Sequence, residues 1–150
     1  MSLEEDIKQE KGFESERHKA VVNVIYTEGW LRSLMAEVLK PHDLTIQQYN
    51  VLRILRGSAP NPISTSCIRS RMLDKMSDAS RIVDRLYKKG LVDKKVCSSD
   101  KRLVDVFITK SGLKELKDID ASMVKFNESL GSVTEEEAAT LNRILDKLRA

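Results

Sequence analysis

The sequence predicts a mainly α-helical fold that carries one small β-hairpin, and three observations support this prediction. Prolines (3) and glycines (6) are few among 150 residues and aromatic side chains make up only 5%, a composition that disfavours an all-β sandwich. Apolar residues recur at intervals of three and four in several long segments, which is the period of amphipathic helices. Two neighbouring β-prone runs, residues 91–96 and 103–108, predict the hairpin.

Two helices are expected before residue 57. The first covers about residues 12–39, and Pro41, which cannot continue a helix, ends it. The second covers about residues 46–56, because Thr45 and Gln48 have the capping-box spacing that satisfies backbone N–H groups at a helix start. The apolar stripe on the first helix consists of Val21, Val24, Ile25, Leu31, Leu34, Met35 and Val38.

The next segment predicts two helices joined by a turn. After a loop with two prolines at residues 57–62, Ser64 caps a short third helix over Cys67, Ile68 and Met72. Capping residues at positions 74–77 precede a fourth helix, which Gly90 ends in the left-handed conformation. Its apolar face holds Ala79, Ile82, Val83 and Leu86, and its opposite face holds Ser77, Ser80, Arg81, Asp84, Arg85 and Lys88.

The last third of the chain predicts the hairpin and two further helices. The two β-prone runs enclose a polar, basic tip at residues 97–102. Thr109 caps a helix whose apolar residues run from Leu113 to Leu130. Thr134 and Glu137 then have capping-box spacing and open a last helix that carries Leu141, Ile144, Leu145 and Leu148.

The order of short helix, turn, amphipathic helix and hairpin is that of a winged helix-turn-helix, and positive charge collects in this part of the chain. Residues 64–110 hold 12 Lys and Arg against 6 Asp and Glu, whereas the remainder holds 14 against 17. A local basic surface indicates a polyanionic partner, and double-stranded DNA is the leading candidate. The major groove admits one α-helix, so we expect residues of about 44–109 to form a DNA-binding lobe.

Candidate DNA-binding residues lie on the fourth helix, at the hairpin tip and at the start of the third helix. An arginine can pair bidentately with guanine, and a serine hydroxyl suits a base edge or a phosphate oxygen. Arg102 is placed to enter the minor groove, while Asp100 is expected to accept a hydrogen bond that holds the tip. The alternative is an ordinary solvated surface with helix-capping serines. The full set is Ser64, Ser66, Ser77, Ser80, Arg81, Arg85, Lys88, Asp100, Lys101 and Arg102.

The sequence resembles the MarR family of bacterial transcription regulators over nearly its whole length. The matching stretches begin with LTIQQY at residues 44–49 and continue with SRIVDRLYKKGLV at 80–92, DKR at 100–102 and FITKSG at 107–112. In that family the aspartate and arginine of a D-x-R motif, here Asp100 and Arg102, lie in the wing, and the arginine enters the minor groove. The family is dimeric, so the resemblance implies that helices within residues 12–42 and 110–150 pair across a two-fold axis, in agreement with their long apolar stripes.

Many members of this family bind small phenolic or aromatic effectors between the dimer helices and the DNA-binding lobe. Tyr26, Trp30, Tyr49 and Phe126 are candidates to line such a pocket, and ordinary packing at the helix junction is the alternative. The resemblance therefore implies a homodimeric, sequence-specific regulator, a ligand-responsive repressor at a pseudo-palindromic operator. The sequence names neither the operator nor the effector.

Other function classes find little support in the sequence. A mix of 41% hydrophobic and 33% charged residues is typical of a folded protein, and no apolar run approaches the roughly 20 residues that span a membrane. We find no nucleophile–base pair, phosphate-binding glycine loop or metal cluster, since His18 and His42 stand alone, so no enzymatic activity, metal or cofactor is expected. Cys67 and Cys97 lack a CxxC spacing, which fits a reducing cytoplasm. Two alternatives stay open: a winged-helix adaptor for an acidic protein, and a thiol-based redox sensor at Cys97.

Overall fold

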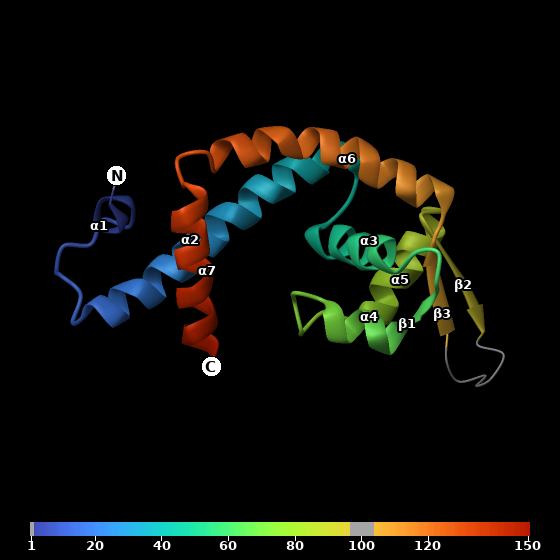
Figure 1. The fold of residues 1–150 in the computed structure, drawn as a ribbon, viewed down its shortest axis with the longest axis horizontal. Helices are drawn as coiled ribbons and strands as arrows, with labels where there is room; N and C mark the ends of the chain where they lie inside the picture. The colour runs from blue at the N-terminus through green and yellow to red at the C-terminus, as the bar shows by residue number, and fades with distance from the viewer. Residues whose placement is uncertain (1, 97–103) are drawn as a thin grey trace.

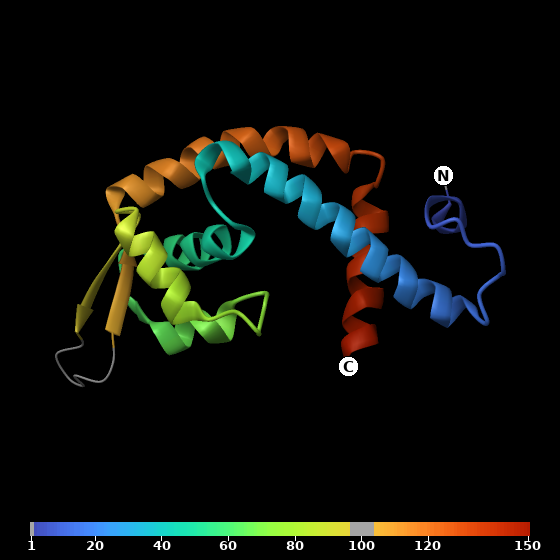
Figure 2. The same ribbon diagram turned by 180° about the vertical axis from the view of Figure 1, so that it is seen from behind.

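A computed structural model describes residues 2–96 and 104–150 and divides them into a small lobe and a set of long helices (Figure 1). The long helices are α2 (Glu16–Leu39), α6 (Lys110–Ser129) and α7 (Glu135–Arg149). The lobe contains α3 (Ile46–Ser58), α4 (Thr65–Arg71) and α5 (Ala79–Lys88) together with a three-stranded sheet. Helix α2 packs against α6, and both views show α1 (Leu3–Asp6) at the end of the molecule opposite the lobe (Figure 2). The mainly α fold with a winged helix-turn-helix is confirmed.

The sheet is antiparallel, with the order β1-β3-β2. Strands β2 (Val92–Val96) and β3 (Val104–Ile108) are the predicted hairpin, and Val92 pairs with Ile108. Strand β1 (Ile63–Ser64) was not predicted, because two residues are too short to show a β period. It adds a third strand to the wing by pairing Ile63 with Val106, and so joins the start of α4 to the hairpin.

Side-chain caps fix where most helices begin, as the sequence predicts. The Thr45 hydroxyl accepts from the backbone N–H of Gln48, and the Gln48 side chain accepts from the Thr45 N–H. Ser64, Thr109 and Thr134 likewise cap α4, α6 and α7. The predicted cap of α5 is wrong: Asp78 is the cap, rather than a residue at 74–77.

The hydrophobic core lies in the lobe and extends to the ends of α2 and α6 that face it. Leu52, Ile68 and Leu86 are completely buried there, as are Leu39 and Leu116 from the long helices. The long helices behave differently beyond this junction. Large apolar side chains stay exposed along α2 and α7, among them Val21, Val24, Ile25, Leu141, Ile144 and Leu148.

Two glycines shape the connection between the lobe and α6. Gly90 follows α5 and has a φ of +71°, the left-handed conformation predicted for it. Gly112 lies in the first turn of α6, where a Cβ atom would stand 2.2 Å from the backbone oxygen of Leu91. The start of α6 therefore packs directly on the backbone that follows α5.

Candidate nucleic-acid interface

Helix α5 buries one face in the lobe and turns a cationic face outward. Its buried residues are Ala79, Val83 and Leu86, because apolar positions three and four apart lie on one side of a helix. The opposite face exposes Ser80 together with a cationic row, which we define as Arg81, Arg85 and Lys88. No side chain among residues 2–96 and 104–150 forms an ion pair with this row. Within the described residues, these three charges are therefore not neutralised by an ion pair.

Asp84, the acidic residue on the same face of α5, forms an ion pair with a lysine of the wing. Lys94 of β2 places its Nζ 2.7 Å from Asp84 Oδ1 and 4.9 Å from the centre of the Tyr87 ring. This ion pair and the cation–π contact join the wing to α5 and orient the two elements relative to each other. Sequence reasoning missed Lys94 and Tyr87, although Asp84 and Lys94, ten residues apart, flank a helix end and a strand start that must lie close together.

The predicted serines occupy different environments. Ser64 accepts from the N–H of Cys67, and its Oγ lies 2.9 Å from that of Ser66, which is exposed at the start of α4. Ser77 precedes α5 instead of lying on its outer face, and its hydroxyl donates to Asp74 Oδ2 at 2.8 Å. The expectation that Ser77 shares the exposed face is corrected accordingly, whereas Ser80 does belong to that face.

The hairpin tip carries the remaining predicted site residues. Cys97, Asp100, Lys101 and Arg102 lie outside the described residues, so their roles stay predictions. In the chain this segment follows β2 and precedes β3, and β3 also pairs with β1 (Figure 1).

Two ion pairs connect the lobe to the long helices, and a histidine–carboxylate contact joins the end of α2 to α6. Arg56 of α3 reaches Asp120 of α6 at 2.6 Å. In η1 (Lys40–His42), which continues α2, His42 Nδ1 lies 2.7 Å from Glu115 Oε1 of α6. Lys89, just after α5, lies 2.7 Å from Asp43 Oδ2. The position of the lobe is thus tied to α2 and α6 by polar contacts as well as by the core.

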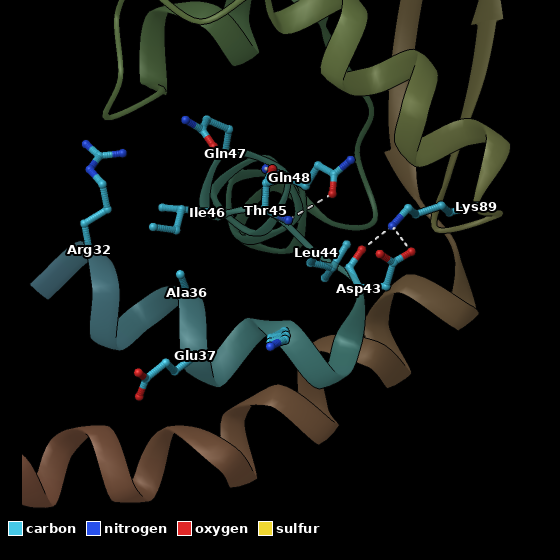
Figure 3. A pocket seen from close by; sticks show the side chains of 11 residues that line it. Arg32, Ala36, Glu37, Asp43, Leu44, Thr45, Ile46, Gln47, Gln48 and Lys89 are labelled. Atoms are coloured by element: carbon cyan, nitrogen blue, oxygen red, sulfur yellow. Dashed lines mark hydrogen bonds and ion pairs between the residues drawn. The ribbon is translucent and has the colours of Figure 1, made fainter.

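A pocket of about 750 Å³ lies between the second half of α2 and the start of α3 (Figure 3). Its apolar wall includes Ala36, Leu44 and Ile46, and Arg32, Lys40 and Lys89 supply positive charge. Glu37 and Asp43 are acidic lining residues, and Lys89 bonds to Asp43 across one end (Figure 3). The wall therefore combines an apolar surface with a net positive rim.

The four aromatic residues predicted to line an effector pocket lie elsewhere than this pocket. Tyr49 is buried in the lobe core, and its hydroxyl accepts from Arg53 Nη1 at 2.9 Å. Tyr26 and Trp30 are exposed on α2, and Phe126 is partly buried on α6. The residues that line this pocket were not predicted, because they come from the polar start of α3, the end of α2 and the distant Lys89. The four aromatic residues stay predictions.

Within the part of the chain that the structure describes, no group of three or more His, Cys, Asp or Glu side chains is arranged to hold a metal ion. Among residues 2–96 and 104–150, no helix combines the length and apolarity needed to cross a lipid bilayer. Cys67 is a partly buried free thiol.

Comparison with known proteins relates these features to regulators of transcription. The family model described as "MarR family" matches residues 44–104. The HTH-type transcriptional repressor IacR of Pseudomonas putida is 32% identical over 113 residues, which are 75% of this chain and 66% of that repressor. The chain thus spans about two thirds of the length of this curated relative.

Two solved structures share the fold along nearly all of their length. The MarR transcription factor from Planctomyces limnophilus is 30% identical with a TM-score of 0.69, covering 90% of this chain and 98% of that one. A mutant MarR from E. coli, in complex with operator DNA, is 25% identical with a TM-score of 0.77, covering 92% of this chain and 99% of that one.

Proposed function

This chain belongs to the MarR family of transcription regulators, and we propose that it is a homodimeric, sequence-specific DNA-binding repressor that responds to a small ligand. The observation that carries this proposal is the cationic row of Arg81, Arg85 and Lys88 on α5, exposed and without an ion-pair partner among the described residues. A helix with such a face fits the major groove, where arginine reads guanine and lysine neutralises phosphate. The similar fold of a MarR protein in complex with operator DNA supports the same role.

The apolar faces of α2 and α7 support the homodimer. Ile25 is 67% exposed and Leu148 is 59% exposed, and α7 contains no buried residue. A second copy of the chain would cover these side chains, and each large one is worth about 1.5–3 kcal/mol when it is fully buried. We therefore assign dimerisation to helices within residues 12–42 and 110–150, and DNA binding to residues 44–109. In such a dimer two copies of α5 would enter successive major grooves.

The pocket beside α3 supports ligand response. Its apolar wall and its Arg32, Lys40 and Lys89 side chains suit a small organic anion with an apolar body, such as an aromatic carboxylate or a phenolate. The pocket touches α2, α3 and Lys89, which connect the long helices to the lobe. Tyr26, Trp30, Tyr49 and Phe126 remain predicted effector contacts. We assign the protein a cytoplasmic, non-enzymatic role, in keeping with a family of transcription regulators.

Selection of bound sites from a random DNA library tests the central proposal. A two-fold dimer should select a pseudo-palindrome whose half-site centres lie about 10 to 10.5 base pairs apart. Binding should also weaken steeply with salt, because phosphate neutralisation releases counterions. A consensus without dyad symmetry would contradict the dimeric geometry. An absence of affinity for any duplex would instead favour an adaptor that uses the same basic face on an acidic protein.

Substitutions then separate base reading from charge. Arg81→Ala or Arg85→Ala should cost about 1–3 kcal/mol on the selected site and relax the preference at one position in each half-site. Lys88→Ala should weaken binding to all sequences alike, and Lys117→Ala, on the exposed side of α6, is the charge-matched control. For the wing, Arg102→Ala should weaken mainly sites with A·T-rich flanks. Equal losses on every duplex would mean that the arginines only neutralise phosphates.

A further inference from the structure

Two large apolar side chains lie outside the core at the turn between α4 and α5. Leu73 is 84% exposed and Met76 is 93% exposed, and we call these two residues the apolar pair. They are the most exposed large apolar side chains among residues 2–96 and 104–150. On α2 and α7 the exposed apolar side chains form long faces instead, and none is more than 67% exposed. The apolar pair is therefore separate from the faces that we assign to the dimer.

Side-chain hydrogen bonds fix the backbone at both members of the pair. The Leu73 N–H donates to Asn50 Oδ1 of α3 at 3.0 Å. The Met76 N–H donates to Asp74 Oδ1, also at 3.0 Å. The turn thus presents its apolar side chains from a backbone that is already ordered, which lowers the entropic cost of any contact that they make.

The position of the turn places the pair beside the start of the recognition helix. Met72, at the end of α4, and Ala79, at the start of α5, are both buried in the core. Between them the turn projects from the lobe on the side away from the sheet (Figures 1 and 2). In a helix-turn-helix the first residues of the second helix contact base edges in the major groove. A side chain just before α5 is therefore within the same surface.

The charges around the pair also suit DNA. Lys75 lies between the two apolar residues, and Arg81 of the cationic row follows in the first turn of α5. The two acidic residues of the turn accept from backbone donors of the protein, Asp74 from the Met76 N–H and Asp78 from the Arg81 N–H. In the major groove an apolar group, the C5-methyl of thymine, lies between two rows of phosphates. Apolar side chains flanked by cations match this arrangement.

We propose that the apolar pair contacts thymine C5-methyl groups in the major groove and so determines a preference for thymine in the operator. The arginines of the cationic row would pair with guanine on the same surface, so the two sets of side chains would recognise different bases. Met76 is expected to make the main contact, because it is the closer of the two to α5 and the more exposed. This inference rests on the proposed function, because it assumes that α5 enters the major groove.

Replacement of thymine by deoxyuridine tests the contact, because it removes the C5-methyl group and leaves base pairing intact. In the operator that the wild type selects, we expect a thymine at which this replacement in one half-site weakens binding by about fourfold. This factor corresponds to about 0.8 kcal/mol, the value of one buried methyl group. Met76→Ala should bind the thymine operator about 16-fold more weakly, because two copies lose the contact and independent effects add. It should no longer distinguish thymine from deoxyuridine at that position.

Three further variants of the full-length chain serve as controls. Met76→Leu keeps an apolar side chain and should keep the preference for thymine. Lys75→Gln removes a charge from the same turn and should weaken binding to the thymine and deoxyuridine operators by the same factor. Leu73→Ala should reduce the preference for thymine, and an unchanged preference would exclude Leu73 from the contact. All three positions are exposed, so chemical denaturation should show wild-type stability.

The outcomes separate this inference from the proposed function. If the wild type selects no duplex, the proposed function fails. If it selects an operator in which no deoxyuridine weakens binding, the methyl contact is overturned and the proposed function stands. Full discrimination by Met76→Ala would overturn the contact in the same way. If Met76→Ala weakens binding to both operators equally and dissociates the dimer in sedimentation equilibrium, a second copy of the chain covers the apolar pair and the inference is wrong.

Discussion

The lobe and the long helices use the same apolar residue types in opposite ways. In the lobe, Leu52, Ile68 and Leu86 are completely buried within one chain. On α2 and α7, Ile25 and Leu148 leave more than half of their surface exposed. The difference shows that the lobe closes its own core, whereas the long helices carry an apolar surface that one chain cannot cover.

The closed core and the open apolar face suit two different roles. A closed core holds α5 and the wing rigidly, as reading DNA requires, because side chains must be placed to within a fraction of an ångström to pair with bases. An open apolar face makes the spacing of two such lobes depend on how two copies pack. The ion pairs of Arg56 with Asp120 and of Lys89 with Asp43 join the two parts at their junction.

Deletion of residues 133–150 should produce the largest effect, because it removes α7 and its whole apolar face. We expect a monomer or an aggregate and complete loss of specific DNA binding, while the core of the lobe keeps its amide protection. Sedimentation equilibrium and operator binding would measure both consequences. A truncated protein that stayed a tight dimer with native affinity would contradict the assignment of α7 to the dimer interface.

Matched isoleucine truncations compare the two parts directly. Ile68→Ala empties a completely buried position and should cost about 2–5 kcal/mol in the free energy of unfolding, independent of protein concentration. Ile144→Ala removes the same atoms from an exposed position on α7 and should act only through the dimer. Its loss of thermal stability should therefore grow on dilution. If both variants responded to dilution in the same way, the two parts would not differ as we describe.

The sequence predicted the lobe well because its signals are local. Capping and turn residues act on backbone groups only a few positions away. Examples are the Thr45–Gln48 capping box, the Ser64 cap and the left-handed Gly90. The buried face of α5 follows from its spacing alone. The short strand β1 was missed for the opposite reason, since its two residues pair with β3 more than forty positions away.

The candidate site was predicted only in part. The cationic row could be predicted from the sequence, because residues three or four positions apart lie on the same face of a helix. The ion pair of Asp84 with Lys94 was not predicted because it joins a helix to a strand, whereas the periodicity of apolar residues describes one element at a time. The pocket lining was missed likewise, because aromatic residues were favoured and it is mainly polar and aliphatic.

Matched glycine substitutions probe the junction and an open part of α2. Gly112→Ala places a Cβ 2.2 Å from the Leu91 oxygen and 2.7 Å from Ile108 Cγ1, so the backbone must move, at a cost of about 1–3 kcal/mol. Gly29→Ala meets no atom within 4 Å and should stabilise α2, by up to about 1 kcal/mol from helix propensity. Chemical denaturation would measure both changes. Two changes of the same sign would refute the close approach at Gly112.

The smallest expected effect is a difference in acid sensitivity between two helix starts. In α3 the capping box is closed by Gln48, which does not titrate, whereas in α7 it is closed by Glu137. The Glu137 carboxylate accepts from the Thr134 N–H at 2.9 Å and from its hydroxyl at 3.0 Å, and these bonds, the backbone one foremost, lower the pKa of Glu137 from its ordinary value of 4.5.

A lowered pKa in the folded state means that the box stabilises α7 fully above pH 4.5 and loses this contribution as pH falls through the folded pKa. Protection factors of the first amides of α7 should therefore decline as the pH falls below 4.5, while those of α3 stay level. Glu137→Gln keeps an acceptor oxygen but cannot titrate, so it should remove the decline. Glu136→Gln changes the same charge in the same turn outside the box and should retain it. A decline that persisted in Glu137→Gln would assign the acid sensitivity of α7 to another group.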